Sequence, residues 1–143
     1  MDNKTTTETQ VKTYVGGCHC GKIRFEAEID LGQPVSRCNC SICTKIGGCS
    51  VIVKPGAFRV TAGSEWMGRY DLSFAPNHRI FCKHCGVQVY GAGHIPEIGG
   101  DFVGVMVNCL DGVELTDLTY QYWDGRHNNW EAGPRPQPWR AYC

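Results

Sequence analysis

The segment that most constrains the fold of this chain is Cys82-Lys83-His84-Cys85-Gly86, in which two residues separate a pair of cysteines. A gap of two residues lets both sulfurs of a tight turn face the same tetrahedral metal ion. Gly86 supplies a permissive backbone, so that amide groups can hydrogen-bond back to the sulfurs. The segment therefore predicts half of a zinc site, because an ion held by four thiolates needs a second pair of cysteines.

Cysteine is unusually frequent in the rest of the chain, which has ten cysteines in 143 residues. In a secreted protein this number would predict a disulfide framework. Residues 1–10 are polar and threonine-rich, however, and contain no apolar stretch of the kind found in a signal peptide. We therefore expect a cytoplasmic protein with reduced thiols. Two more clusters, Cys18-x-Cys20 and Cys38-x-Cys40-x-x-Cys43, then favour metal binding over disulfides.

Seven clustered cysteines divide naturally into a set of four and a set of three. Four thiolates close a structural zinc site, whereas three protein ligands leave one position open, as in catalytic zinc sites. Spacing alone leaves the partition undecided. Cys38, Cys40 and Cys43 lie within six residues, so a single turn can deliver all three to one ion. In that case the structural site would combine the remaining four: Cys18, Cys20, Cys82 and Cys85.

A site made of three thiolates has a characteristic chemistry. Three negative ligands offset most of the charge of the ion, so bound water is activated less than it is beside neutral histidines. Soft sulfur ligands favour a sulfur substrate in the fourth position, where zinc lowers the pKa of the incoming thiol. The sequence therefore predicts a site that handles a small-molecule thiol.

The hydropathy pattern predicts a mainly β, single-domain protein. Residues 22–29 alternate strictly between charged and apolar side chains, which is typical of a half-buried strand. We expect a disordered tail at residues 1–12, a domain at 13–143, a turn at Gly16-Gly17 and a helical turn at Ser41–Ile46. Further strands are expected at residues 34–38, 50–53, 57–61, 66–71, 79–82, 87–90, 102–108 and 119–122.

Charge limits the classes of partner. The chain has 14 basic and 14 acidic residues and no basic run, so it has no overall field that would attract it to nucleic acid or to an acidic membrane. Its longest apolar stretches are too short to span a membrane. These observations favour small-molecule partners and leave the oligomeric state open.

Three ordered motifs resemble the glutathione-dependent formaldehyde-activating enzyme family, which also includes the centromere protein V domain. They are Gly17-Cys18-His19-Cys20-Gly21-Lys22-Ile23-Arg24-Phe25, Cys38-Asn39-Cys40-Ser41-Ile42-Cys43 and Arg79-Ile80-Phe81-Cys82-Lys83-His84-Cys85-Gly86, within a resemblance over residues 14–125. The resemblance implies a β-tent-like zinc-binding fold of several small antiparallel sheets. It also implies one structural zinc at Cys18, Cys20, Cys82 and Cys85 and one catalytic zinc at Cys38, Cys40 and Cys43.

The activity that the resemblance implies is the joining of glutathione to formaldehyde, a carbon–sulfur lyase reaction in the reverse sense. We therefore expect a zinc-dependent enzyme that combines glutathione or a related thiol with an aldehyde-type electrophile. The alternative is a zinc-stabilised module that docks a protein partner without catalysis. The chain departs from the family pattern at Asn39, where histidine is usual, and at residues 44–47 and 107–112. The roles of Cys109, His78 and His94 stay open.

Overall fold

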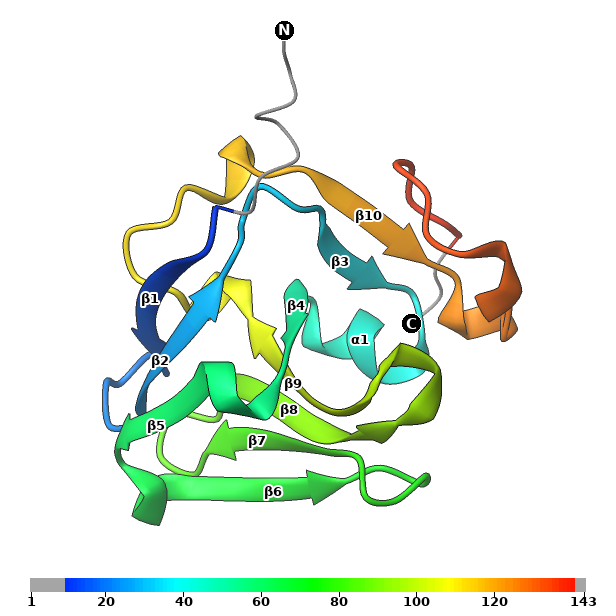
Figure 1. Ribbon diagram of the computed structural model, residues 1–143. Helices are drawn as coiled ribbons and strands as arrows, with labels where there is room; N and C mark the ends of the chain where they lie inside the picture. The colour runs from blue at the N-terminus through cyan, green and yellow to red at the C-terminus, as the bar shows by residue number, and fades with distance from the viewer. Residues whose placement is uncertain (1–9, 141–143) are drawn as a thin grey trace, which may run out of the picture.

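The strands of the protein form two sheets, and the computed structural model describes residues 10–140 (Figure 1). The prediction of a mainly β protein is confirmed. The first nine residues of the expected tail, together with Cys143, lie outside the described residues. No helix in the described part of the chain is long and apolar enough to cross a membrane.

The smaller sheet contains three antiparallel strands in the order β1-β2-β5. The strands are β1 (Lys12–Gly17), β2 (Arg24–Ile29) and β5 (Phe58–Ala62). The alternation predicted for residues 22–29 is confirmed in β2, where Phe25 and Ala27 are buried. On the opposite face, Glu26 and Glu28 both pair with Arg59, at 2.9 and 3.5 Å.

The larger sheet contains seven strands in the order β10-β3-β4-β9-β8-β7-β6. All neighbours are antiparallel except β10 and β3, which run in parallel and place Trp123 beside Cys38. The strands are β3 (Val35–Cys38), β4 (Ser50–Val53), β6 (Met67–Asp71), β7 (His78–Cys82), β8 (Gln88–Ile95), β9 (Gly100–Met106) and β10 (Tyr120–Trp123). In Figure 1 the sheet curves from β10 at the top to β6 at the bottom, with α1 between its two ends.

The Gly16-Gly17 pair is not the turn that the sequence predicted, because both residues belong to β1. A Cβ atom on Gly16 would lie 2.4 Å from the Cys109 carbonyl oxygen and 2.9 Å from the Phe25 ring. Glycine is required at this position because two other segments approach the backbone closely. The turn comes later, and it contains Gly21 at a φ of 83°.

The core lies between the two sheets and is built from their inward-facing side chains. Phe25 of β2 packs against Phe58 of β5, with ring centroids 5.2 Å apart, and Phe58 packs against Tyr90 of β8 at 4.6 Å. Val35, Val89 and other core residues are fully buried. Each such side chain contributes on the order of 2 kcal/mol through its removal from water, so this core holds the two sheets together.

Short helices connect the strands. The predicted helical turn at Ser41–Ile46 is confirmed as α1, which ends at Gly47 in the left-handed conformation. The strand predicted at residues 102–108 stops at Met106, since the chain then enters a 3-10 turn. The 3-10 helices are η2 (Pro55–Ala57), η3 (Ser64–Trp66), η4 (Pro96–Ile98), η5 (Val107–Cys109), η6 (Leu115–Asp117), η7 (Gly125–His127) and η8 (Trp130–Ala132).

Candidate functional site

The structure gathers four cysteines from two distant segments, which we call the four-cysteine group: Cys18, Cys20, Cys82 and Cys85. Their sulfurs all lie within 4.8 Å of one another, with Cys18 to Cys20 at 3.5 Å and Cys20 to Cys82 at 3.7 Å. Sulfurs bound at ~2.3 Å to a tetrahedral ion would be about 3.8 Å apart. The group therefore has the size that a single thiophilic ion requires.

The backbone around the four-cysteine group favours thiolates over thiols. The Ile23 amide donates a hydrogen bond to Cys18 Sγ at 3.3 Å, and the His84 amide donates one to Cys82 Sγ at 3.3 Å. Desolvation acts to raise the pKa of Cys85, but backbone hydrogen bonds from Cys20 and Val87 outweigh it and bring that pKa to about 6. The donors thus suit a positive ion, which would complete the ionisation of the group.

The second cluster, which we call the three-cysteine group, contains Cys38, Cys40 and Cys43. Cys38 ends β3, Cys40 is the N-cap residue of α1, and Cys43 lies within that helix. The Cys40 amide donates a hydrogen bond to Cys38 Sγ at 3.4 Å. The three sulfurs again lie within 4.8 Å of one another, so a strand end and the helical turn that follows it bring three sulfurs to one point.

Crowding controls how these three thiols ionise. Hydrogen bonds from the Cys38 and Cys43 thiols lower the pKa of Cys40. The same contacts, with Cys38 first, raise the pKa of Cys43, because one sulfur holds the negative charge and its neighbours keep their protons. A cation at the group would allow all three to ionise. Its donor set therefore fits a metal ion, and in the described residues it offers one ligand fewer than the four-cysteine group.

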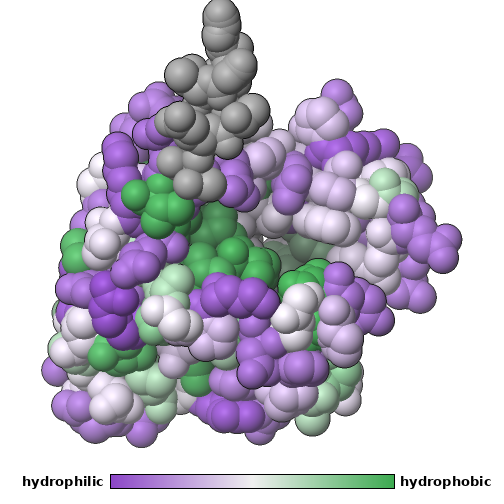
Figure 2. Space-filling view, in the orientation of Figure 1, coloured by the Kyte–Doolittle hydropathy of each residue, from purple (hydrophilic) through white to green (hydrophobic). Residues whose placement is uncertain are grey.

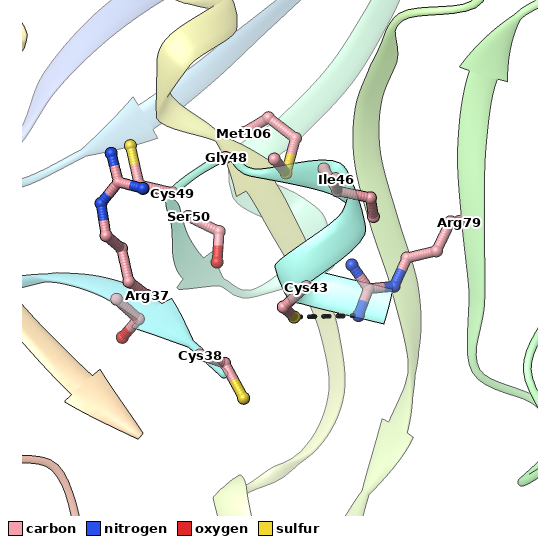
Figure 3. Close-up of a pocket in the computed structure, with 10 residues that line it drawn as sticks. Arg37, Cys38, Cys43, Ile46, Gly48, Cys49, Ser50, Arg79 and Met106 are labelled. Atoms are coloured by element: carbon pink, nitrogen blue, oxygen red, sulfur yellow. Dashed lines mark hydrogen bonds between the residues drawn. The ribbon is translucent and has the colours of Figure 1, made fainter. Parts of the chain in front are cut away.

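A basic side chain from β7 reaches the three-cysteine group. Arg79 extends from β7 toward α1, and its Nη2 donates to Cys43 Sγ at 3.9 Å (Figure 3). Both residues line a cavity of about 50 Å³. The Arg37 guanidinium lines the same cavity but points toward Cys49 (Figure 3). Arg79 is therefore the cation placed to interact with a sulfur anion here.

Asn39 lies between Cys38 and Cys40 and is buried. Its side chain anchors the loop that carries the three cysteines. Asn39 Nδ2 donates to Asp124 Oδ1 and to the Arg140 carbonyl oxygen, each at 2.7 Å. Asn39 Oδ1 accepts from the Arg126 amide at 2.9 Å. Asp124, also buried, accepts a further hydrogen bond from His127 Nδ1 at 2.7 Å. This hydrogen-bond network connects the loop of the three-cysteine group, residues 38–43, to the C-terminal segment.

A close approach between Gly125 and Cys38 completes this packing. A Cβ atom on Gly125 would lie 2.8 Å from Cys38 Sγ and 2.7 Å from the Trp130 ring. Only glycine lets the backbone pass so near to the sulfur. The position of Cys38 therefore depends on residues far beyond its own strand.

A larger recess opens beside the same cysteines. A second cavity, of about 200 Å³, is lined by Cys38 and Cys43 and by residues of β10 and the C-terminal segment. Figure 2 shows a recess between the β3–β10 edge and the strands below it, with hydrophobic side chains gathered around it. The three-cysteine group thus adjoins both cavities, and a small molecule can lie against it.

The other cysteines and histidines named from the sequence lie outside the two cysteine groups. Cys49 and Cys109 are buried outside both groups, and all nine described cysteines are free thiols. His78 contacts the Pro76 carbonyl oxygen at 2.9 Å. His94 contacts Asp101 at 2.7 Å, because strand pairing places these two opposite each other. Neither histidine lines the two cavities described above.

Three features of the site escaped sequence reasoning. Arg79 belongs to a recognised motif, but nothing in its spacing indicates contact with Cys43. Asp124 is 85 residues from Asn39, and tryptophans such as Trp139 are usually assigned to the core or to an exposed rim. The available signal was Asn39, a position at which the family resemblance led us to expect histidine.

Fold and site together define a class: a small β-protein that carries two clusters of free thiols suited to metal ions. The comparison with known families agrees. The family described as glutathione-dependent formaldehyde-activating enzyme matches residues 13–126. This chain belongs to that family.

Individual relatives support the assignment. A Halomonas elongata protein named putative glutathione-dependent formaldehyde-activating enzyme is 35% identical over 83 residues, which are 52% of this chain and 53% of that protein. An Emericella nidulans protein with the same name is 38% identical over 106 residues, which are 68% of this chain and 52% of that protein. The chain thus spans about half the length of these curated relatives.

A solved structure shares the fold. The crystal structure of a Rhodobacter sphaeroides protein matches this chain with a TM-score of 0.67 and 28% identity. The match covers 76% of this chain and 98% of the other. About a quarter of the present chain therefore lies outside the match.

Proposed function

We propose that the protein is a zinc-dependent enzyme that joins glutathione, or a related thiol, to an aldehyde, which is a carbon–sulfur lyase reaction in the reverse sense. A sulfur–carbon bond forms, the carbonyl π bond opens, and the thiol proton ends on the new hydroxyl oxygen. No oxidant or reductant is needed. All nine described cysteines are free thiols, which suits a reducing compartment, and we propose a cytoplasmic location.

The two cysteine groups have different roles in this proposal. Four thiolates from segments more than sixty residues apart suit a structural zinc that holds β1 and β7 together. The observation that carries the function is the three-cysteine group, which has one ligand fewer and adjoins two cavities. Zinc bound there would supply a Lewis acid that lowers the pKa of an incoming thiol.

Residues of the chain itself provide the other requirements. Arg79 makes no ion pair with a carboxylate of the described residues, so its guanidinium is available to an anionic thiol such as glutathione. A charge-assisted hydrogen bond from arginine orients a carboxylate or thiolate more strongly than a neutral donor does. Asn39 anchors the loop that carries the three cysteines through its hydrogen bonds to Asp124, Arg126 and Arg140.

The proposal is tested by the exchange rate between free and thiol-bound formaldehyde, measured by NMR with glutathione in excess. Cys40→Ser should abolish the enzymatic acceleration and lower the zinc content from two equivalents per chain to one. Cys109→Ala is the matched control, because Cys109 is a buried thiol outside both groups. It should keep both zinc ions and the full rate.

A folded Cys40→Ser protein that holds one zinc and turns over at the normal rate would exclude this mechanism. So would a normal chain that binds a single zinc and shows no acceleration at any glutathione concentration. The second result would instead favour a binding module stabilised by the four-cysteine group.

A further inference from the structure

The larger cavity beside the three-cysteine group is lined in part by aromatic side chains. We use the name aromatic wall for three aromatic residues and the proline beside them: Tyr122, Trp123, Pro138 and Trp139. Tyr122 and Trp123 belong to β10, which runs beside β3 and places Trp123 next to Cys38. One cavity therefore brings together Cys38, Cys43 and flat ring-bearing side chains, and Arg37, Asn39 and Thr44 complete its lining.

Hydrogen bonds fix the aromatic wall. Trp139 Nε1 donates to the Tyr122 carbonyl oxygen at 2.8 Å, and the Arg135 guanidinium lies 3.5 Å from the centroid of the Trp139 ring. Trp123 Nε1 donates to Ser36 Oγ at 3.3 Å. Because both indole N–H groups already have partners, the Trp123 and Trp139 rings offer a ligand hydrocarbon surface, whereas Tyr122 also carries a hydroxyl. A wall of this kind selects by shape and apolar contact.

Size indicates what the cavity can hold. Its volume is about 200 Å³, with Arg37, Asn39 and Thr44 as the polar part of its lining. A cavity of ~150 Å³ is sufficient for a benzene molecule. Formaldehyde has two non-hydrogen atoms and would leave most of this space empty. An electrophile that carries one aromatic ring would fill it and contact the aromatic wall.

Half of the wall comes from a segment outside the family match. The match ends at residue 126, whereas Pro138 and Trp139 follow it. This segment is held in place by the pairing of Tyr122 with Arg135 and by the Arg140 carbonyl, which accepts from Asn39. Residues beyond the shared domain thus shape this chain's cavity, so the formaldehyde in the family name does not determine what the wall binds.

We propose that the electrophile of this protein is an aldehyde with an aryl group, and that Trp139 is the residue that determines this specificity. The inference rests on the proposed function, because it names the second substrate of the same site. The sulfur attacks the carbonyl carbon, the thiol proton ends on the carbonyl oxygen, and the aryl group lies against Trp139 and Trp123.

The first test compares benzaldehyde with formaldehyde as substrates, with glutathione as the thiol and the full, zinc-loaded chain as the enzyme. We expect kcat/KM to be higher for benzaldehyde. Trp139→Leu keeps apolar bulk without a ring and should lower kcat/KM for benzaldehyde at least about tenfold more than for formaldehyde. Trp139→Phe keeps a ring and should retain most of the preference. Tyr70→Ala removes an exposed aromatic from β6 and should change neither value.

The second test measures binding without turnover, using S-benzylglutathione and S-methylglutathione as stable thioethers. Isothermal titration should show at least about tenfold tighter binding of the benzyl compound, and Trp139→Leu should remove the difference. Turnover of formaldehyde alone, or equal effects of Trp139→Leu on both aldehydes, would overturn the aryl assignment and leave the proposed function standing. Turnover of neither aldehyde would contradict the proposed function. Equal binding of the two thioethers would overturn the proposal that the aromatic wall binds an aryl group.

Discussion

Replacing Asn39 by alanine should weaken both the fold and the three-cysteine group, because this one amide links the loop of that group to the C-terminal segment. Asn39 is 6% exposed, and its side chain makes three hydrogen bonds of 2.7–2.9 Å. At about 1 kcal/mol for each bond, the free energy of unfolding should fall by about 3 kcal/mol. For a chain of this size that loss corresponds to a decrease in Tm of about 10 °C.

Urea unfolding followed by circular dichroism, with both proteins fully zinc-loaded, measures this loss directly. Asn129→Ala is the matched control, because Asn129 donates a single 3.3 Å hydrogen bond to the same Asp124, and it should cost less than about 1 kcal/mol. A chromogenic chelator should remove zinc faster from the three-cysteine group of Asn39→Ala than from that of the unaltered chain. Release from the four-cysteine group should be unchanged.

The reasoning would be refuted if Asn39→Ala lost no more stability than Asn129→Ala. A loss of stability with unaltered zinc release would refute the link between Asn39 and the loop of the three-cysteine group. Asn39→Asp provides a further check, because it places a second carboxylate against Asp124. Its stability should improve on mild acidification, unlike that of Asn39→Ala.

Three further outcomes are expected. Burial acts to raise the pKa of Asp124, but hydrogen bonds from Asn39 and His127 outweigh it and lower that pKa below its ordinary 3.8. The carboxylate therefore stabilises the fold fully above that value and progressively less as the pH falls through the lower folded pKa, so Asp124→Asn should flatten the acid limb of a stability–pH curve. Cys82→Ser should lose the structural zinc and unfold at much lower temperature than Cys40→Ser, as differential scanning calorimetry would show. Arg79→Gln should raise KM for glutathione by about five- to tenfold with a smaller change in kcat, a split that initial-rate kinetics would measure.

Local patterns were sufficient to predict much of the fold. Alternation at residues 22–29 predicted β2 because strand side chains repeat every two residues. Short spacings predicted that neighbouring cysteines converge on one point, because ligands on one turn lie close together. The division into four and three came from the family resemblance, and the structure gathers the cysteines in those two groups. The helical turn at Ser41–Ile46 followed from the position of Cys43 and the glycines after it.

Contacts between distant segments could not be predicted in the same way. The pairing of β10 with β3 depends on how the chain returns after eighty residues, and no local periodicity encodes that. Gly16 resembled a turn residue because sequence does not reveal the Cys109 carbonyl packed against it. The role of Asn39 likewise depends on Asp124, which becomes its neighbour only in the folded chain.

The parallel pairing of β3 with β10 has a consequence for biogenesis. The loop that carries Cys38, Cys40 and Cys43 acquires its outer neighbour only when residues 120–123 have been synthesised. Until then these nascent thiols lack the cover of Gly125 and the residues that follow it, and an oxidant could crosslink them before a metal ion arrives. Recovery of active protein after denaturation should therefore depend on reductant and zinc being present from the start.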